Sequence, residues 1–147
     1  MRYSPYILLM LVLLYSCSPP YKLNAAEQKY ADDLRKACNC NVKIEKDGKA
    51  EKGETNKGTA WVELNYTDSR QNMCAKDSIE LFHSAQAMAA NFATVMANKD
   101  RYTSIAVQFF SSDFQVQGAE IPACDRTYYF DRASNEFIRY SDPGKNK

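Results

Sequence analysis

The chain has 147 residues, and 45% of them are hydrophobic, which suits one domain with a modest core. Its 19 Lys and Arg nearly balance its 18 Asp and Glu, so the formal net charge is only +1. Without a basic excess to hold phosphates, we expect no nucleic-acid partner.

The first stretch of the chain has the layout of a secretory signal peptide. Arg2 is the only charged side chain before Lys22, and an apolar run from Tyr6 to Tyr15 follows it. This run is too short to cross a hydrocarbon core of ~30 Å as a helix, which takes roughly 20 residues. We therefore expect residues 1–16 to be a cleaved leader and residues 17–23 to be a tether, which the motif described next implies is lipidated.

The end of this leader carries a recognisable motif. Leu14-Tyr15-Ser16-Cys17 resembles the lipobox of bacterial lipoproteins, in which an aliphatic residue, a small residue and an invariant cysteine recur. Leu14, Ser16 and Cys17 match, whereas Tyr15 is bulkier than the usual occupant. The resemblance implies cleavage before Cys17 and its acylation, with chains such as palmitate, and two or more acyl chains anchor a protein stably to a lipid bilayer. An ordinary secreted protein cut near Cys17 is the alternative.

The residue after the cysteine of the lipobox-like motif bears on the location of the protein in the cell envelope. Ser18, rather than Asp, follows Cys17. In the enterobacterial sorting rule this favours the outer membrane, so we expect a lipid-anchored protein of the cell envelope that faces the periplasm.

Four further cysteines, an even number, predict two disulfides in an exported chain: Cys38, Cys40, Cys74 and Cys124. Because one residue separates Cys38 from Cys40, we expect each to bond with Cys74 or Cys124, and both pairings stay open. Zinc sites usually use Cys-x-x-Cys spacing, and no helix start follows Cys40 as a redox thiol would require. We therefore expect no metal and no cofactor.

Residues 24–142 are expected to form the single domain, beginning with a helix and two strands. Asn24 and Glu27 have the spacing of a capping box, which predicts a helix to about Cys38. Its apolar face would hold Ala26, Tyr30, Leu34 and Ala37, with Glu27 elsewhere. Strict alternation then predicts strands over 41–46 and 59–67. In the first strand Val42 and Ile44 face the core, and in the second Val62, Leu64 and Tyr66 do so, which turns Trp61 to the other face.

The second half of the domain is predicted to hold one long helix and three strands. Asp77 and Glu80 suggest another capping box, and the helix behind it should run to about Asn98. Its apolar stripe is expected to comprise Ile79, Phe82, Ala89, Phe92, Ala93 and Met96. A strand over 104–111 follows, and then a hairpin of 126–131 and 136–141 around residues 132–135. Residues 143–147 should form a flexible tail.

The order α-β-β-α-β-β-β favours an α+β fold. We expect a two-layer sandwich with an antiparallel sheet of four to five strands and two helices on one face. No specific domain family is recognised from these residues.

The catalytic inventory of the sequence is sparse. His83 is the only histidine, and Ser84 points about 100° away from it on a helix, so the two cannot act as base and nucleophile. We therefore lean against an enzyme.

The open face of the sheet gives the positive indication. Trp61, Phe110 and Tyr129 all fall on the set that faces away from the expected core, and exposed aromatics on a rigid sheet are common binding anchors. The alternative is that a loop such as residues 118–124 covers them. Exposure of these aromatics favours a non-catalytic binding or adaptor lipoprotein for a protein or glycan partner. A toxin-neutralising or enzyme-inhibiting lipoprotein is the first alternative, and a small periplasmic hydrolase is the second.

Overall fold

The computed structural model describes residues 22–46, 58–66, 76–111, 114–116, 119–121 and 124–141. The expected leader, Cys17, most of the tether, Cys74 and the tail after Ser141 lie outside these residues. The helices are α2 (Ala25–Cys38), α3 (Ser78–Val95) and the short 3-10 helix η2 (Lys99–Arg101). The strands are β1 (Asn41–Glu45), β2 (Gly58–Asn65), β3 (Tyr102–Ser111), β4 (Phe114–Val116), β5 (Ala119–Ile121), β6 (Cys124–Asp131) and β7 (Phe137–Ser141).

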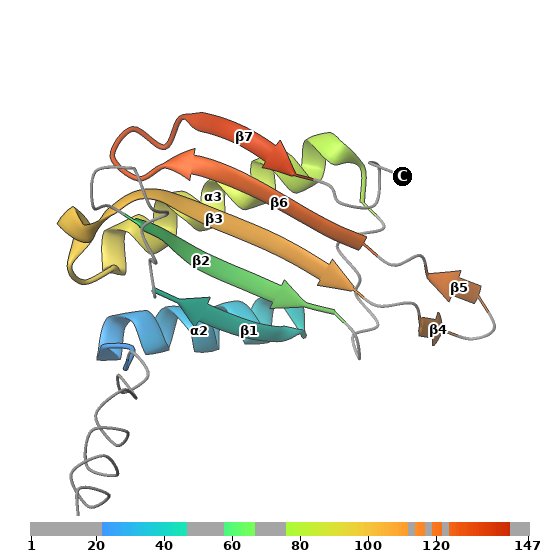
Figure 1. Cartoon of the computed structure of the whole chain (residues 1–147). Helices are drawn as coiled ribbons and strands as arrows, with labels where there is room; N and C mark the ends of the chain where they lie inside the picture. The colour runs from blue at the N-terminus through green and yellow to red at the C-terminus, as the bar shows by residue number, and fades with distance from the viewer. Residues whose placement is uncertain are drawn as a thin grey trace, which may run out of the picture.

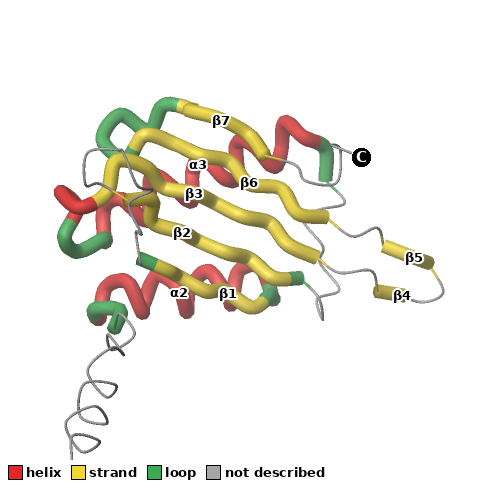
Figure 2. Tube along the Cα trace, in the orientation of Figure 1, coloured by secondary structure: helices red, strands yellow, loops and turns green. Residues whose placement is uncertain are grey.

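The architecture confirms the predicted two-layer α+β fold. Five strands form one sheet in the order β1-β2-β3-β6-β7, and β4 and β5 form a separate two-stranded ribbon beyond its end. Figure 1 views the sheet from its open side, and both α2 and α3 lie behind it. The same layering is seen in Figure 2, where both helices lie behind the strands.

One pair of strands departs from the expected antiparallel sheet. β2 and β3 are parallel, whereas the β1–β2, β3–β6 and β6–β7 pairs are antiparallel. Parallel neighbours need a crossover connection, usually a helix, and α3 supplies it between β2 and β3. The sheet is therefore mixed, with mostly antiparallel pairing.

The hydrophobic core lies between the sheet and its two helices. Val62 and Leu64 of β2, Val107 and Phe109 of β3, and Phe92 of α3 are all fully buried. Val62 and Leu64 confirm the predicted inward set on β2. Each large side chain contributes ~1.5–3 kcal/mol by leaving water, so the two central strands and α3 supply much of the stability.

Side-chain caps fix the starts of both helices. The Asn24 carboxamide oxygen accepts a hydrogen bond from the Glu27 backbone N–H at 2.8 Å, and the Asn24 N–H donates to the Glu27 carboxylate at 2.9 Å. This reciprocal pair confirms the predicted capping box. At α3, the Asp77 carboxylate accepts from the backbone N–H groups of Ile79 and Glu80.

The buried faces of the helices differ from the expected stripes. On α2 the buried residues are Glu27, Ala31 and Cys38, whereas Ala26 and Ala37 are exposed. The expectation that Glu27 lies away from the core was wrong, because an ion pair compensates its charge there, as described below.

On α3 the buried residues are Leu81, Ala85, Ala89 and Phe92, while Ile79 is 70% exposed. Ile79 was wrongly assigned to the core, since it lies in the first turn, where the opposite side of the helix faces the sheet. The helix also ends at Val95, earlier than expected. Asn98 takes the left-handed conformation just after it and leads into η2.

The predicted hairpin around residues 132–135 is present between β6 and β7. The Asp131 carboxylate accepts hydrogen bonds from the backbone N–H groups of Ser134 and Ala133 at 2.8 and 2.9 Å, and these bonds lower the pKa of Asp131. Asn135 then adopts φ 57°, a left-handed conformation that asparagine tolerates well. The turn brings Phe137 opposite Phe130, and a register shift between Tyr129 and Phe130 then pairs Arg139 with Tyr129.

Candidate functional site

Two groups of side chains stand apart from the apolar core. The first, named here the Glu27–Lys46 network, is a buried ionic cluster where both helices meet the sheet. The second, named the Trp61 row, is a line of side chains across the open face: Glu45, Trp61, Ala106, Tyr129 and Arg139.

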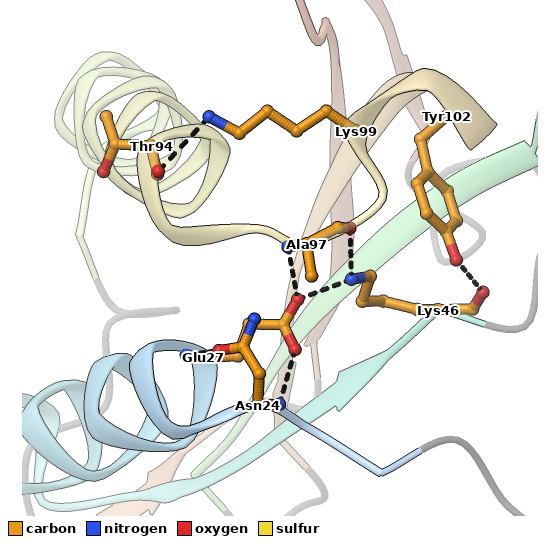
Figure 3. A network of polar contacts seen from close by, with 7 residues as sticks. All are labelled: Asn24, Glu27, Lys46, Thr94, Ala97, Lys99 and Tyr102. Atoms are coloured by element: carbon orange, nitrogen blue, oxygen red, sulfur yellow. Dashed lines mark hydrogen bonds and ion pairs between the residues drawn. The ribbon is translucent and has the colours of Figure 1, made fainter.

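The Glu27–Lys46 network is centred on a lysine that enters the core. Lys46 follows β1 directly and has the same parity as the inward residues Val42 and Ile44. Its ammonium donates to Glu27 Oε1 at 2.5 Å and to the carbonyl oxygen of Ala97 at 2.7 Å (Figure 3). Both charged side chains are 0% exposed. The pair therefore joins the start of α2, the end of β1 and the turn after α3.

Hydrogen bonds keep the buried carboxylate ionised. Burial alone would raise the pKa of Glu27, but hydrogen bonds from Lys46 and from the backbone N–H groups of Asn24 and Ala97 outweigh it, so the pKa is lowered. The Tyr102 hydroxyl donates to the carbonyl oxygen of Lys46, which ties β3 to the same cluster (Figure 3). A catalytic acid or base must reach a substrate, and neither buried charge does. The network therefore has a structural role, since it holds α2 and the turn after α3 against β1 and β3.

The Trp61 row follows from the register of the sheet. Trp61 of β2 lies beside Ala106 of β3, and Ala106 lies opposite Tyr129 of β6. Glu45 on β1 and Arg139 on β7 extend the row to the two edges. One line of neighbouring side chains thus crosses all five strands of the main sheet.

The two aromatic rings of the row meet over its smallest member. The Trp61 and Tyr129 ring centroids are 5.6 Å apart at 80°, an edge-to-face contact, and the Arg139 guanidinium lies 4.2 Å from the centroid of the Tyr129 ring. Ala106 between them is 0% exposed. Trp61 and Tyr129 are half-buried, so each keeps part of its ring in contact with solvent.

A polar row runs alongside the aromatic one. Glu63, Gln108 and Thr127 are cross-strand neighbours two residues further along their strands. The Gln108 amide donates to the Asp125 carboxylate at 2.7 Å. The open face therefore presents an aromatic centre with polar groups beside it, the composition that protein interfaces favour.

Two of the three predicted binding residues come together, and the third does not. Phe110 is half-buried on the same face, but it lies four residues along β3 from Ala106, a separation of ~13 Å. It pairs with Asn65 and Asp125 instead. The expected three-residue face is therefore a pair, Trp61 and Tyr129, which Arg139 completes. The predicted hairpin alone would pair Tyr129 with Ile138, and the register shift between Tyr129 and Phe130 brings Arg139 there instead, which no pattern in the sequence signalled.

The cysteines do not pair as expected in the described part of the chain. A disulfide joins Cys38 to Cys40, whose Sγ atoms are 2.06 Å apart, instead of linking each to Cys74 or Cys124. Asn39 between them is left-handed, with φ 48° and ψ 45°, which turns the chain between α2 and β1. Cys124 is disulfide-bonded as well, and Cys74 lies outside the described residues.

The remaining candidates for chemistry do not converge. His83 is exposed on α3, and its ring contacts Phe82 at a centroid distance of 5.5 Å. Within residues 22–46, 58–66, 76–111 and the described segments after them, no group of three or more His, Cys, Asp or Glu side chains is placed to hold a metal ion. No helix among these same segments is long and apolar enough to span a membrane.

Comparison with protein-family models, with curated proteins and with solved structures finds no match for the chain.

Proposed function

We propose that the protein is a non-catalytic binding module of the bacterial envelope, anchored through acylated Cys17, which captures a partner on the open face of its sheet. The observation that carries the binding role is the contact of Trp61 with Tyr129 over Ala106, with Arg139 stacked on Tyr129. The resemblance of Leu14 to Cys17 to a lipobox supports the anchor.

The chemistry of the row favours a protein partner. Tryptophan, tyrosine and arginine are the residue types that dominate the energetics of protein interfaces. Here all three lie together on paired strands, so little conformational entropy is lost when a partner binds. The neighbouring Glu63 and Gln108 can supply the polar rim of such an interface. A glycan partner is the other outcome of the test below.

Truncation of the tryptophan tests the binding role. Trp61→Ala should weaken partner capture by ~2 kcal/mol or more if Trp61 is a hot spot. Its effect on folding should be smaller, since an edge-to-face pair adds ~0.5–1.5 kcal/mol beyond its burial. The measurement is recovery of cross-linked partner from solubilised membranes, alongside urea unfolding of each variant.

His83→Ala is the matched control, because it removes an exposed ring from the helical layer. The control should capture partner as the original chain does. Undiminished capture by Trp61→Ala would contradict the assignment of the open face. If muramidase treatment releases the captured material, the partner is a glycan instead of a protein.

The anchor has its own test. Cys17→Ala should abolish metabolic labelling with palmitate and move the protein from the membrane fraction to the soluble fraction. Unchanged labelling and membrane recovery would refute the lipoprotein assignment, and would leave the binding face untouched.

A further inference from the structure

The two edges of the main sheet are built differently. β1 exposes only polar side chains along its length: Asn41, Lys43 and Glu45. β7 instead exposes three large hydrophobic side chains, with Phe137 46%, Ile138 52% and Tyr140 40% exposed. Natural proteins usually protect a sheet edge with charges, as β1 does here. Within β7 the charge is limited to Arg139, beside these three hydrophobic side chains, and Figure 2 shows the strand at the margin of the sheet.

The helix-facing side of β7 extends the aromatic packing of the core and stays partly exposed. α3 packs against β3 and β6. Phe137 reaches back to Phe82 of α3 at a centroid distance of 5.4 Å, and Tyr140 contacts Tyr128 of β6 at 5.0 Å. The outer parts of both rings remain in solvent. An additional strand at this edge would place its own apolar side chains against them.

The other side of β7 carries a positive charge. Arg139 is exposed and stacks on Tyr129. In the part of the chain that the structure describes, no carboxylate lies within ion-pair distance of it. A strand added beside β7 would therefore gain from an acidic residue opposite Arg139, because opposite charges on paired strands stabilise each other.

We propose that β7 accepts an extended segment of a partner protein as a sixth strand, with acidic side chains beside Arg139 and apolar side chains beside Phe137 and Tyr140. Main-chain hydrogen bonds along the outer edge of β7, the last strand of the sheet in the described residues, would supply affinity, and the alternating side chains would supply selectivity. A second copy of this chain fits less well. In the fully overlapping antiparallel register of β7 with itself, Arg139 would lie opposite Arg139. This inference rests on the proposed binding role and names its partner class.

Two synthetic peptides test the proposal on the full-length chain in detergent. One is a capped seven-residue peptide of alternating valine and glutamate, and the control peptide has lysine in place of glutamate. The glutamate peptide should bind and slow amide hydrogen exchange in residues 137–141, whereas the lysine peptide should not. Arg139→Glu should weaken the glutamate peptide by about tenfold and allow the lysine peptide to bind. Lys43→Glu, the same charge reversal on the β1 edge, should change neither result.

Each contrary outcome overturns the proposal. Protection on β1 instead of β7, equal binding of both peptides, or binding of neither would refute strand addition at this edge. Slowed exchange of β7 that grows with protein concentration alone, together with a dimer in sedimentation, would assign the edge to a second copy. Failure of strand addition at β7 would not refute binding through the open face. The peptides test the β7 edge, whereas Trp61→Ala tests the Trp61 row.

Discussion

The Glu27–Lys46 network and the Trp61 row use strong interactions in opposite ways. In the network both charged side chains are 0% exposed, and hydrogen bonds within the chain hold the carboxylate and the ammonium. In the row the rings of Trp61 and Tyr129 are half-buried and Arg139 is exposed. Buried, satisfied charges fix the position of helices against a sheet, whereas partly exposed aromatic rings leave binding surface available. The comparison predicts that the first region governs stability and the second governs recognition.

Loss of the buried ammonium should have the largest effect. Lys46→Met keeps the length of the side chain but leaves the Glu27 carboxylate buried without its cation, which costs ~3–5 kcal/mol of unfolding free energy. Urea unfolding followed by circular dichroism measures it. The double variant Glu27→Gln, Lys46→Met removes the buried charge as well and should recover part of the loss. Equal stability of Lys46→Met and the original chain would show that the network is dispensable.

Acid should remove the contribution of the network next. The folded-state pKa of Glu27 lies below its ordinary value of 4.5. The unfolded chain therefore binds the proton more readily, and the stability from ionised Glu27 is complete above about pH 4.5 and lost as pH falls through the folded-state pKa. The unfolding free energy, measured from pH 7 to pH 3, should therefore depend less on pH in Glu27→Gln than in the original chain.

The control for acid is an exposed carboxylate on the same helix. A hydrogen bond from Lys29 also lowers the pKa of Asp33, but this pair lies in solvent, where ion pairs contribute little. Asp33→Asn should therefore keep nearly all of the acid dependence. A larger change in Asp33→Asn than in Glu27→Gln would contradict the assignment to the buried pair.

The smallest expected effect concerns the disulfide beside the network. Cys38 and Cys40 are two residues apart, and closing so short a loop stabilises a protein by about 1.5 kcal/mol, against about 4 kcal/mol for a long loop. Cys40→Ser should therefore lower the unfolding free energy only slightly.

The pairing itself can be mapped by peptide mass. Cleavage after Lys36 and Lys43 places both cysteines in one peptide, residues 37–43. Without reduction this peptide should appear alone, with a mass lower by two hydrogens. A cross-linked peptide that contains residue 74 or 124 would instead support pairing with Cys74 or Cys124.

Local patterns predicted most of the fold. Alternation placed Val62 and Leu64 inward, and the cap spacing of Asn24 with Glu27 marked the start of α2. The parallel pairing of β2 with β3 was missed because short links between strands were given more weight than the crossover through α3. Whether two strands pair parallel or antiparallel depends on the connection between them, and the alternation of side chains within each strand carries no information about it.

The candidate site was predicted less completely, because it depends on pairing between distant segments. The burial of Lys46 was not predicted, although it shares the parity of Val42 and Ile44, because a lysine is rarely buried unless another element supplies a carboxylate. Trp61 and Tyr129 were expected on one face, while their contact and the stacking of Arg139 required the register across three strands. Phe110 lies on the same face of the sheet as Trp61 and Tyr129, but it lies outside the Trp61 row.

Site-specific photocrosslinking in intact cells tests the division of roles most directly. A benzoyl-phenylalanine at position 63 lies on the open face beside Trp61, and one at position 36 lies on the exposed side of α2. We predict a discrete adduct from position 63 that disappears in Trp61→Ala and persists in Asp33→Asn, with none from position 36. Adducts from position 36 alone, or adducts from position 63 that survive Trp61→Ala, would contradict recognition through the Trp61 row.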